Sequence, residues 1–217
     1  MKIDMHVHTE YSSDCLIKLS SIKEAVKRKG IHGVAICDHN EIEGALKLRE
    51  IVDFPVIVGE EIMTTGGEII GLFLNKKIMS GMEPRAAVWE IKEQGGLVVI
   101  PHPFDRLRSS ALDPQALSEI QEYIDIIEVF NSRNVFQKDN DLAEEYADEN
   151  KFNKCSGSDA HTLLEVGNAY IEIEAFSDAE DFLSKCKASK ISGNKSSLLC
   201  HAFTKTYKSI KKVSVFR

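Results

Sequence analysis

Short apolar runs alternate with longer amphipathic segments along most of the chain. The runs are rich in Val and Ile, which is typical of β-strands. They comprise Ile3–Val7, Gly33–Cys37, Val56–Ile62, Ile69–Leu74, Leu97–Ile100, Ile124–Phe130, the neighbours of Cys155, and Ala169–Ile173. The pattern therefore predicts about eight strands, distributed from the beginning of the chain to near residue 173.

The segments between these runs carry apolar residues at helical spacing. They predict helices at Ile22–Lys29, Glu41–Val52, Glu83–Gln94, Pro114–Glu122, Asp139–Asn150 and Asp178–Ala188. Ser20 and Ser21 precede the first helix, Gly30 follows it, and Pro84 fits the first turn of the third. Strands that alternate with helices indicate βα units around a parallel sheet, and about seven units favour a closed or nearly closed barrel.

One interval departs from this alternation. Residues 61–74 contain Thr64-Thr65-Gly66-Gly67 between two apolar runs, with too few residues for a helix. Gly-rich sequence of this kind between apolar runs predicts a local β-hairpin.

The composition is that of a soluble globular protein, with 217 residues, 43% hydrophobic residues and 28% charged residues. We expect a single domain over 1–217, no membrane segment, no signal peptide and a cytoplasmic location. The five cysteines are odd in number and form no Cys-x-x-Cys, so they indicate neither a disulfide framework nor a thiolate zinc site.

Charge is distributed unevenly around the net value of −7. Residues 195–217 contain five Lys, one Arg and no acid, and 196–212 have helical spacing. We expect a basic C-terminal helix that packs on the barrel. The acidic remainder argues against a large nucleic-acid interface, although the basic end leaves nucleic acid open as a partner.

Residues that can bind a divalent cation stand at the end of nearly every predicted strand. They are Asp4, His6, His8, Asp38, His39, Glu60, Glu61, His102, Glu128, Asp159 and His161. In a barrel the carboxyl ends of the strands share one face, where such folds hold their sites. We therefore expect these residues to converge, whereas His32 and His201 lack this placement and are interpreted as structural.

The spacing of the first three of these residues has a direct geometric meaning. Alternate residues of a strand point to the same side, so His6 and His8 can hold one cation together, and Asp4 shares that side. A His-x-His alone is a weak signal; its position at the end of a strand and the other ligand types make the set informative.

Taken together, the motifs resemble the PHP family, the polymerase and histidinol phosphatase superfamily of metal-dependent phosphoesterases. The motifs that carry the resemblance are His6-x-His8-Thr9 followed by Tyr11-Ser12-Ser13-Asp14, Cys37-Asp38-His39-Asn40, Gly59-Glu60-Glu61-Ile62, Pro101-His102-Pro103, Ile127-Glu128-Val129-Phe130-Asn131 and Gly157-Ser158-Asp159-Ala160-His161. The resemblance implies a distorted (β/α)7 barrel with two or three metal ions at the carboxyl ends of the strands.

The resemblance also implies a role for each ligand. His6, His8, Glu61 and Asp159 would hold one ion, and Glu61 would bridge to a second ion held by His102 and also by Glu128. A third ion would be held by Asp14, His39 and His161. Imidazole and carboxylate ligands without thiolates suit Zn²⁺, Mn²⁺ or Fe²⁺.

A phosphate monoester of a small molecule is the substrate that this set favours: a nucleotide, a nucleoside bisphosphate or a histidinol-phosphate-like compound. A hydroxide bridging two cations would attack phosphorus in line. Arg106 and Arg133 follow the His102 and Glu128 motifs and are expected to grip phosphate, with Asn40 and Asn131 as further substrate contacts. Asp38 is either a catalytic residue that orients a ligand or shuttles a proton, or a helix cap.

Three other functions stay open at this stage. The basic C-terminus is compatible with an exonuclease that acts on short oligonucleotides. The same metals could cleave an amide, and a metal-stabilised module could lack turnover altogether. The helical insertion that nucleotide-type relatives carry between the bridging Glu and the His-Pro motif is absent here, which predicts a more open pocket.

Overall fold

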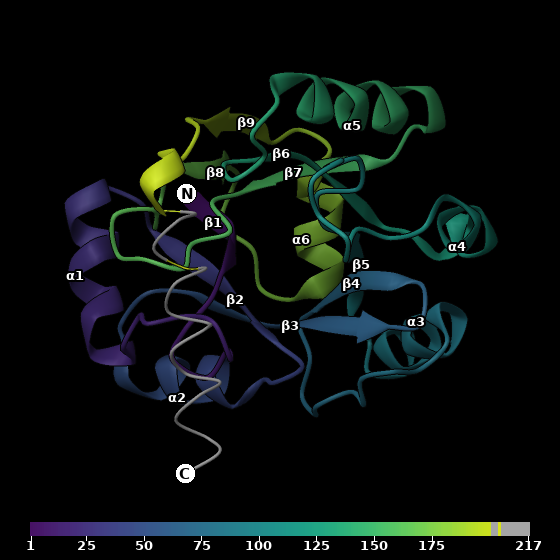
Figure 1. Ribbon diagram of the computed structural model, residues 1–217. Coiled ribbons are helices and arrows are strands. Elements are labelled where there is room, and N and C mark those ends of the chain that lie inside the picture. Colours follow the sequence, from purple (N-terminus) through teal and green to yellow (C-terminus); the bar gives the residue numbers. More distant parts are fainter. Residues whose placement is uncertain (201–203, 205–217) are drawn as a thin grey trace, which may run out of the picture.

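Figure 1 shows the computed structural model, which describes residues 1–200 and residue 204. Within these residues nine strands form one sheet in the order β7-β6-β5-β4-β3-β2-β1-β8-β9. The strands are β1 Lys2–Val7, β2 Gly33–His39, β3 Val56–Thr64, β4 Gly67–Leu72, β5 Leu97–Ile100, β6 Ile126–Asn131, β7 Asn153–Gly157, β8 Ala169–Glu172 and β9 Lys190–Gly193. The sequence pattern did not indicate the last of these.

The sheet curves into a nearly closed barrel. Strands β1, β2, β3, β5, β6 and β7 run in one direction, and β4 runs antiparallel between β3 and β5. The barrel closes at the carboxyl end of β1, where Val7 forms a parallel bridge with Ala160 and the His8 N–H donates to the Ala160 carbonyl at 3.1 Å. The predicted barrel-like α/β architecture is thus confirmed.

The alternation of strands and helices is interrupted at two places in the described chain. β3 and β4 are joined directly by Thr65 and Gly66, with Thr64 paired to Gly67, which confirms the predicted hairpin. No helix separates β7 from β8, and β8 pairs antiparallel with the beginning of β1. The barrel is therefore built from fewer regular βα units than the strand count suggests.

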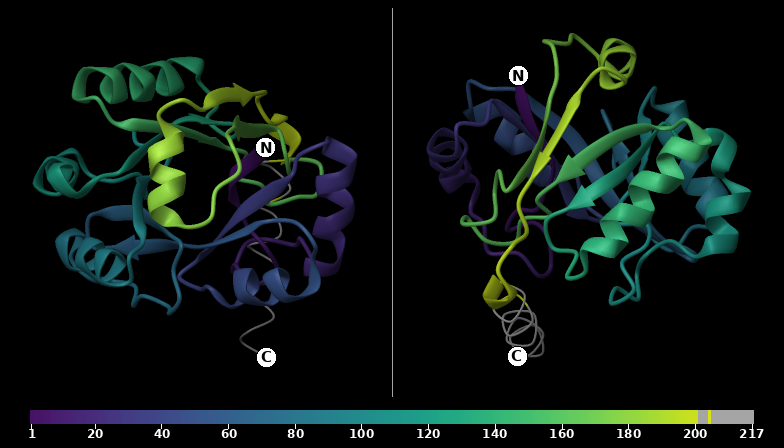
Figure 2. Two further views of the ribbon diagram at one scale, coloured as in Figure 1. Left: turned by 180° about the vertical axis from the view of Figure 1, so that it is seen from behind. Right: turned by 90° about the horizontal axis from the view of Figure 1, so that it is seen from above.

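The helices are α1 Leu19–Lys29, α2 Glu43–Ile51, α3 Pro84–Glu93, α4 Pro114–Glu119, α5 Gln137–Asn150 and α6 Ala179–Cys186, with a 3₁₀ turn at Gln121–Tyr123. Gly30 ends α1 with a φ of 64°, a conformation that glycine adopts without strain. The helix predicted over 114–122 is divided at Ile120, which is not helical. Helices α1 to α5 surround the sheet, and α6 lies across one end of the barrel (Figures 1 and 2).

Two apolar layers follow from this arrangement. The outer layer packs residues such as Ile36, Val98 and Ile127 of the strands against the surrounding helices. We call the second layer the floor cluster; it contains Ile3, Met5, Ala35, Cys37, Ile57, Ile70, Leu72, Leu97, Val99, Ile126, Cys155, Ile171, Ile173, Phe182 and Cys186. Phe182 of α6 is fully buried in it, so α6 covers the floor of the barrel.

The chain after β9 crosses the opposite face of the barrel. The Ser196 N–H donates to the Ser132 carbonyl at 2.7 Å, and the Asn194 N–H donates to the Asn168 carbonyl at 2.8 Å. The basic helix predicted within 195–217 lies for the most part outside the described residues. Among the helices that are described, none is long and apolar enough to span a bilayer.

Candidate metal centre

Five histidines meet at the carboxyl ends of the strands. His6 is the penultimate residue of β1 with His8 just beyond the strand, and His39 ends β2; His102 and His161 follow β5 and β7. The His8 ring centroid lies 4.3 Å from that of His161, 4.6 Å from that of His39 and 5.0 Å from that of His6. The structure thus brings together residues that are far apart in sequence, as the strand-end pattern predicts.

Glu61 of β3 lies at the centre of these rings. Its Oε2 is 3.4 Å from His6 Nε2, 3.3 Å from His8 Nε2 and 3.0 Å from His39 Nδ1, while its Oε1 is 3.0 Å from His102 Nε2. A single carboxylate thereby touches four imidazoles, which is the position a bridging ligand requires.

The neighbouring Glu60 faces the opposite side of β3. Its carboxylate is buried and accepts a hydrogen bond from the Ile78 N–H at 2.8 Å, and burial raises its pKa to about 7. The strand alternation therefore places Glu61, and not Glu60, in the cluster.

Two aspartates complete the predicted ligand set. Asp159 Oδ1 is 3.3 Å from His8 Nε2, and Asp14 lies 3.4 Å from His161 Nε2 and 3.6 Å from His39 Nε2. Asp159 and His102 both have positive φ values, 52° and 33°. Such conformations are costly for residues with side chains and persist where the surrounding structure fixes them, commonly at functional sites.

Three histidines are held by their Nδ1 atoms, and this leaves Nε2 directed at the centre. His6 Nδ1 is 3.1 Å from Glu128 Oε1, His8 Nδ1 is 3.1 Å from Ser12 Oγ, and His161 Nδ1 is 2.8 Å from the carbonyl of Asp159. A hydrogen-bond acceptor facing Nδ1 keeps the ring proton on Nδ1, so Nε2 retains a lone pair that can bind a cation. Imidazole ligands in metal sites are commonly oriented by such hydrogen bonds.

Glu128 lies behind the cluster. Besides the contact with His6, its Oε2 accepts the His102 N–H at 2.8 Å and the Asn131 amide at 2.9 Å. These contacts engage both oxygens, so the geometry favours a positioning role over the direct metal contact predicted from the sequence.

Glu68 is a member of the cluster that the sequence interpretation missed. It is buried on β4, with Oε1 at 3.7 Å from His39 Nδ1 and Oε2 at 3.7 Å from His102 Nε2. Because β4 pairs antiparallel with β3, Glu68 returns to the end of the barrel where Glu61 lies. The sequence does contain a signal for it: Glu68 is an acidic residue near the beginning of an otherwise apolar strand, directly after the hairpin glycines.

Asp38 and Asp4 are buried, and they hold loops in place. Asp38 accepts hydrogen bonds from the Thr9 N–H and hydroxyl, both at 2.6 Å, and from the Ser12 hydroxyl at 2.9 Å. It makes no side-chain cap for α2. Asp4 was expected on the side of His6 and His8, but its oxygens accept the backbone N–H groups of Ser158 and Gly167. The register of β1 shifts between Asp4 and Val7, which interrupts the simple alternation.

The arginine nearest the ligands is Arg108, where Arg106 was expected. Arg106 is half exposed and paired with Asp139 through contacts of 2.6 and 2.8 Å, because its side chain turns towards α5. Arg108 donates to Asp159 and lies 3.5 Å from Asp105. The loop after β5 therefore presents its second arginine, and not its first, to the ligands.

The other predicted contacts occupy supporting positions. Arg133 is buried, 3.6 Å from Glu165 and 3.1 Å from the Thr204 hydroxyl. Asn131 donates to Glu128 and Asp159 and accepts the Arg133 N–H at 2.8 Å. In the β2–α2 loop, the Asn40 Oδ1 accepts the Met63 N–H at 2.8 Å and so ties that loop to β3.

The charges of the cluster are strongly coupled. Burial opposes ionisation of Glu61, but the neighbouring His39 and His6 outweigh it and lower the pKa of Glu61 well below its usual range. Burial also opposes protonation of His6, yet the carboxylates of Glu61, Glu128 and Asp159 raise its pKa well above 6.5. For His8, burial and the neighbouring His161 and His39 lower the pKa to about 3.

The donor set fits divalent cations. Three groups of buried or partly buried side chains bring ligand atoms within 4.8 Å of one another: His6, His8 and Glu61; His8, His39 and His161; and His39, Glu61 and Glu68. Glu61 Oε2 and Asp159 Oδ1 are buried, and their polar neighbours are imidazole nitrogens such as His39 Nδ1 and His8 Nε2. Buried carboxylate oxygens of this kind are costly unless a cation satisfies them. The side chains therefore define a metal-binding centre at one end of an α/β barrel.

Comparison with known proteins agrees with this assignment. Residues 137–191 match the PHP-associated family. The uncharacterized protein MJ0417 of Methanocaldococcus jannaschii is 40% identical over 175 residues, which cover 79% of this chain and 70% of that protein. The chain belongs to the PHP superfamily.

Solved structures share the fold. A two-domain protein from Bacteroides vulgatus that contains a predicted PHP-like metal-dependent phosphoesterase has a TM-score of 0.74 at 18% identity, with 89% of this chain and 65% of that chain covered. This chain thus spans less than two thirds of that protein. An amidohydrolase from Chromobacterium violaceum with bound sulfate has a TM-score of 0.61 at 16% identity, with 77% of this chain and 90% of that chain covered.

Proposed function

We propose that the protein is a metal-dependent hydrolase that cleaves phosphate monoesters of small molecules. The observation that carries the proposal is the convergence of imidazole nitrogens and buried carboxylate oxygens at one point. The similarity to a protein that contains a predicted PHP-like phosphoesterase supports the reaction class.

The clustered residues support two or three cations. One ion would take His6, His8, Glu61 and Asp159 as ligands, and another would take Glu61 and His102 with Glu68. Asp14, His39 and His161 would hold the third. Bound divalent cations would lower the pKa of a water molecule and offset the charge that builds up on a phosphoryl group.

The remaining polar residues prepare this centre for a phosphate. Arg108 lies against Asp159, so its remaining N–H groups are the nearest arginine donors for non-bridging phosphate oxygens. Ser12 and Asp38 together hold the ring of His8, and Glu128 holds the ring of His6. These contacts keep the ligands oriented, so little reorganisation is needed when charge develops.

The test is a screen of phosphorylated metabolites and p-nitrophenyl phosphate with added Mn²⁺ or Zn²⁺, using protein purified without chelator. We expect phosphate release that chelation abolishes and metal restores. His6→Ala should abolish it, whereas His32→Ala is the matched control, because His32 is exposed and its ring accepts a hydrogen bond from the Lys2 N–H far from the cluster. Less than one transition metal per chain would contradict the proposal.

Amide hydrolysis is the second candidate, favoured by the fold shared with the Chromobacterium amidohydrolase. The same screen, extended to N-acyl compounds, separates the two reactions: amine release without phosphate release would favour the amidohydrolase. Release of mononucleotides from oligonucleotides, faster than phosphate release from monoesters, would instead favour an exonuclease.

A further inference from the structure

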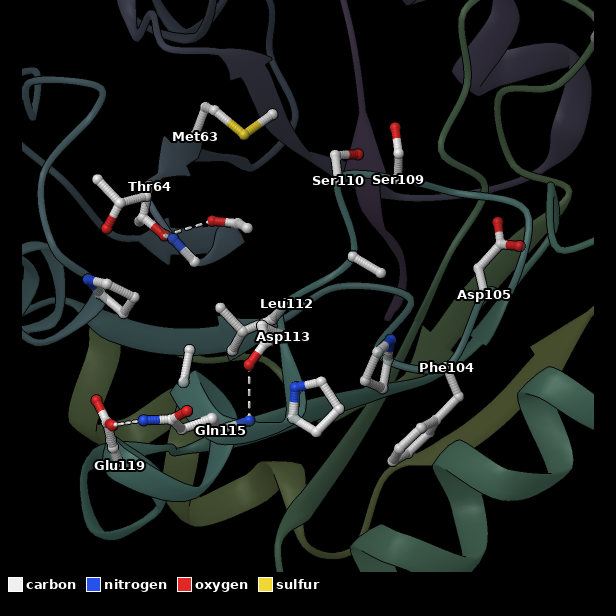
Figure 3. A pocket seen from close by; sticks show the side chains of 18 of the residues that line it. Met63, Thr64, Phe104, Asp105, Ser109, Ser110, Leu112, Asp113, Gln115 and Glu119 are labelled. Carbon is white, nitrogen blue, oxygen red and sulfur yellow. Dashed lines mark hydrogen bonds between the residues drawn. The ribbon is translucent and has the colours of Figure 1, made fainter.

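An open pocket of about 910 Å³ lies beside the metal centre. Its walls are the β3–β4 turn (63–67), the first residues of α3 and the segment 103–116 after β5, and Glu119 of α4 lies at its lower edge in Figure 3. The volume is far larger than a phosphate group needs. The pocket therefore has room for an organic group attached to a phosphate held at the metals.

The pocket and the metal centre share a wall. The Ser110 hydroxyl lines the pocket and donates to Glu68 Oε2 at 2.6 Å. Asp105 also lines the pocket, and it lies 3.5 Å from Arg108, which in turn donates to Asp159. Arg108 therefore lies between Asp105 of the pocket wall and Asp159 of the metal centre, and a phosphate held at the metals would lie on the far side of this shared wall.

The ionisable groups of the pocket are mostly acidic. Four carboxylates line it: Glu83, Asp105, Asp113 and Glu119; Asp105 is buried and paired with Arg108 at 3.5 Å, so the exposed negative charge comes from the other three. Arg106 is the one cation among the lining residues, and Asp139, which does not line the pocket, neutralises it. The pocket therefore repels an anion and attracts a cation.

The other lining groups are neutral and mixed in polarity. Thr65, Ser109 and Ser110 supply hydroxyls, and Met63 and Leu112 supply apolar surface. In Figure 3 the two serines stand at one end of the pocket and Glu119 at the other, bonded to Gln115. A group that extends from the metals across the pocket would meet hydroxyls first and exposed carboxylates last.

We propose that this pocket binds the alcohol part of the substrate and selects phosphate monoesters whose alcohol part ends in a neutral or cationic group, such as an amine. It rejects esters that carry a second phosphate at that end. This inference rests on the proposed phosphatase function, and it narrows the substrate class of the same site.

Three probes that differ only at the far end test the charge preference: 6-aminohexyl phosphate, hexyl phosphate and hexane-1,6-diyl bisphosphate. We expect kcat/KM to fall in that order, with roughly a tenfold difference between the amine and the bisphosphate at low ionic strength. The difference should shrink at high salt, because three of the four carboxylates are exposed.

Paired charge variants assign the preference to the pocket. Glu83→Gln with Glu119→Gln should raise kcat/KM for the bisphosphate relative to the amine several-fold. Glu93→Gln with Glu149→Gln removes the same charge from exposed positions that do not line the pocket, and it should leave the ratio unchanged. An equal change in both double variants would overturn the inference.

A steric variant tests occupancy independently of charge. Thr65 is exposed and lines the pocket, so Thr65→Trp should fill space there. We expect lower kcat/KM for 6-aminohexyl phosphate, unchanged kcat/KM for methyl phosphate and unchanged metal content. Hydrolysis of all probes at equal rates by every variant would overturn the pocket inference but leave the phosphatase proposal intact. Hydrolysis of none would contradict both.

Discussion

The two ends of the barrel interior are filled by opposite kinds of side chain. At the floor, Phe182 packs with apolar side chains from the strands. At the rim, buried histidines and carboxylates crowd together, with Glu61 in contact with four imidazoles. Several strands contribute residues to both the floor and the rim, at different positions along their length.

The difference teaches where stability and function reside. The floor cluster stabilises the barrel by removing apolar surface from water, which needs no ligand. The rim carries buried charges and residues in the left-handed region, such as Asp159 and His102. Such features are costly in themselves, so the rim depends on the floor, and bound cations would offset the cost of its buried charges.

The largest expected effect is at the centre of the rim. Glu61→Gln keeps the shape of the side chain but removes the charge that four imidazoles share. We expect a loss of metal and roughly a thousandfold or greater fall in kcat, because in the proposed reaction the cations would generate the nucleophile. Metal analysis and phosphate release measure this. Glu60→Gln is the neighbouring control, and comparable losses there would contradict the distinction between the two faces of β3.

The floor should respond in the opposite way. Phe182→Ala leaves a cavity in the floor cluster and should lower the free energy of unfolding by about 3–5 kcal/mol. Activity per folded molecule should change little at a temperature where the variant stays folded. Urea unfolding and metal titration check this, and weakened metal binding in the folded variant would show that the two layers are coupled.

The two arginines of the loop after β5 sharpen the comparison within the rim. Arg108→Lys should lower kcat by about a hundredfold, since lysine lacks the forked guanidinium that donates to Asp159 and would, in the proposed reaction, also donate to phosphate. Arg106→Lys should change kcat by about twofold or less, because its half-exposed pair with Asp139 lies outside the cluster. Steady-state kinetics on one substrate compares them directly, and the reverse order would favour the sequence-based choice of Arg106.

The smallest expected effect is a dependence of metal binding on pH. Neighbouring carboxylates raise the pKa of His6 above 6.5. In the metal-free protein, protonated His6 therefore stabilises the fold. This stabilisation is complete below pH 6.5 and is lost as the pH rises through the raised pKa. A cation must displace this proton, and its affinity should therefore rise with pH. We expect a larger metal-induced increase in Tm at pH 8 than at pH 6, measured by thermal unfolding. A larger increase at pH 6 would contradict the assignment of His6 as a ligand.

Most of the strands and helices, and the residues at the ends of the strands, could be predicted from the sequence. Strands and helices could be predicted because burial of one side makes apolar residues recur at a regular spacing. The hairpin could be predicted because Gly66 and Gly67 mark a turn. The ligand cluster was found because parallel strands end on one face. The missed β9 is short and only half-buried, so it left no clear apolar run.

Side-chain direction was decided by the tertiary structure. Arg106 and Arg108 are equivalent in the sequence, and only the position of Asp139 on α5 and of Asp159 after β7 separates their roles. Glu68 joins the ligands because antiparallel pairing returns β4 to Glu61, and Glu128 is drawn behind them by the His102 N–H. Local sequence determines the periodicity of burial and where each strand ends. Contacts between segments that are distant in the sequence determine which partner a flexible charged side chain binds.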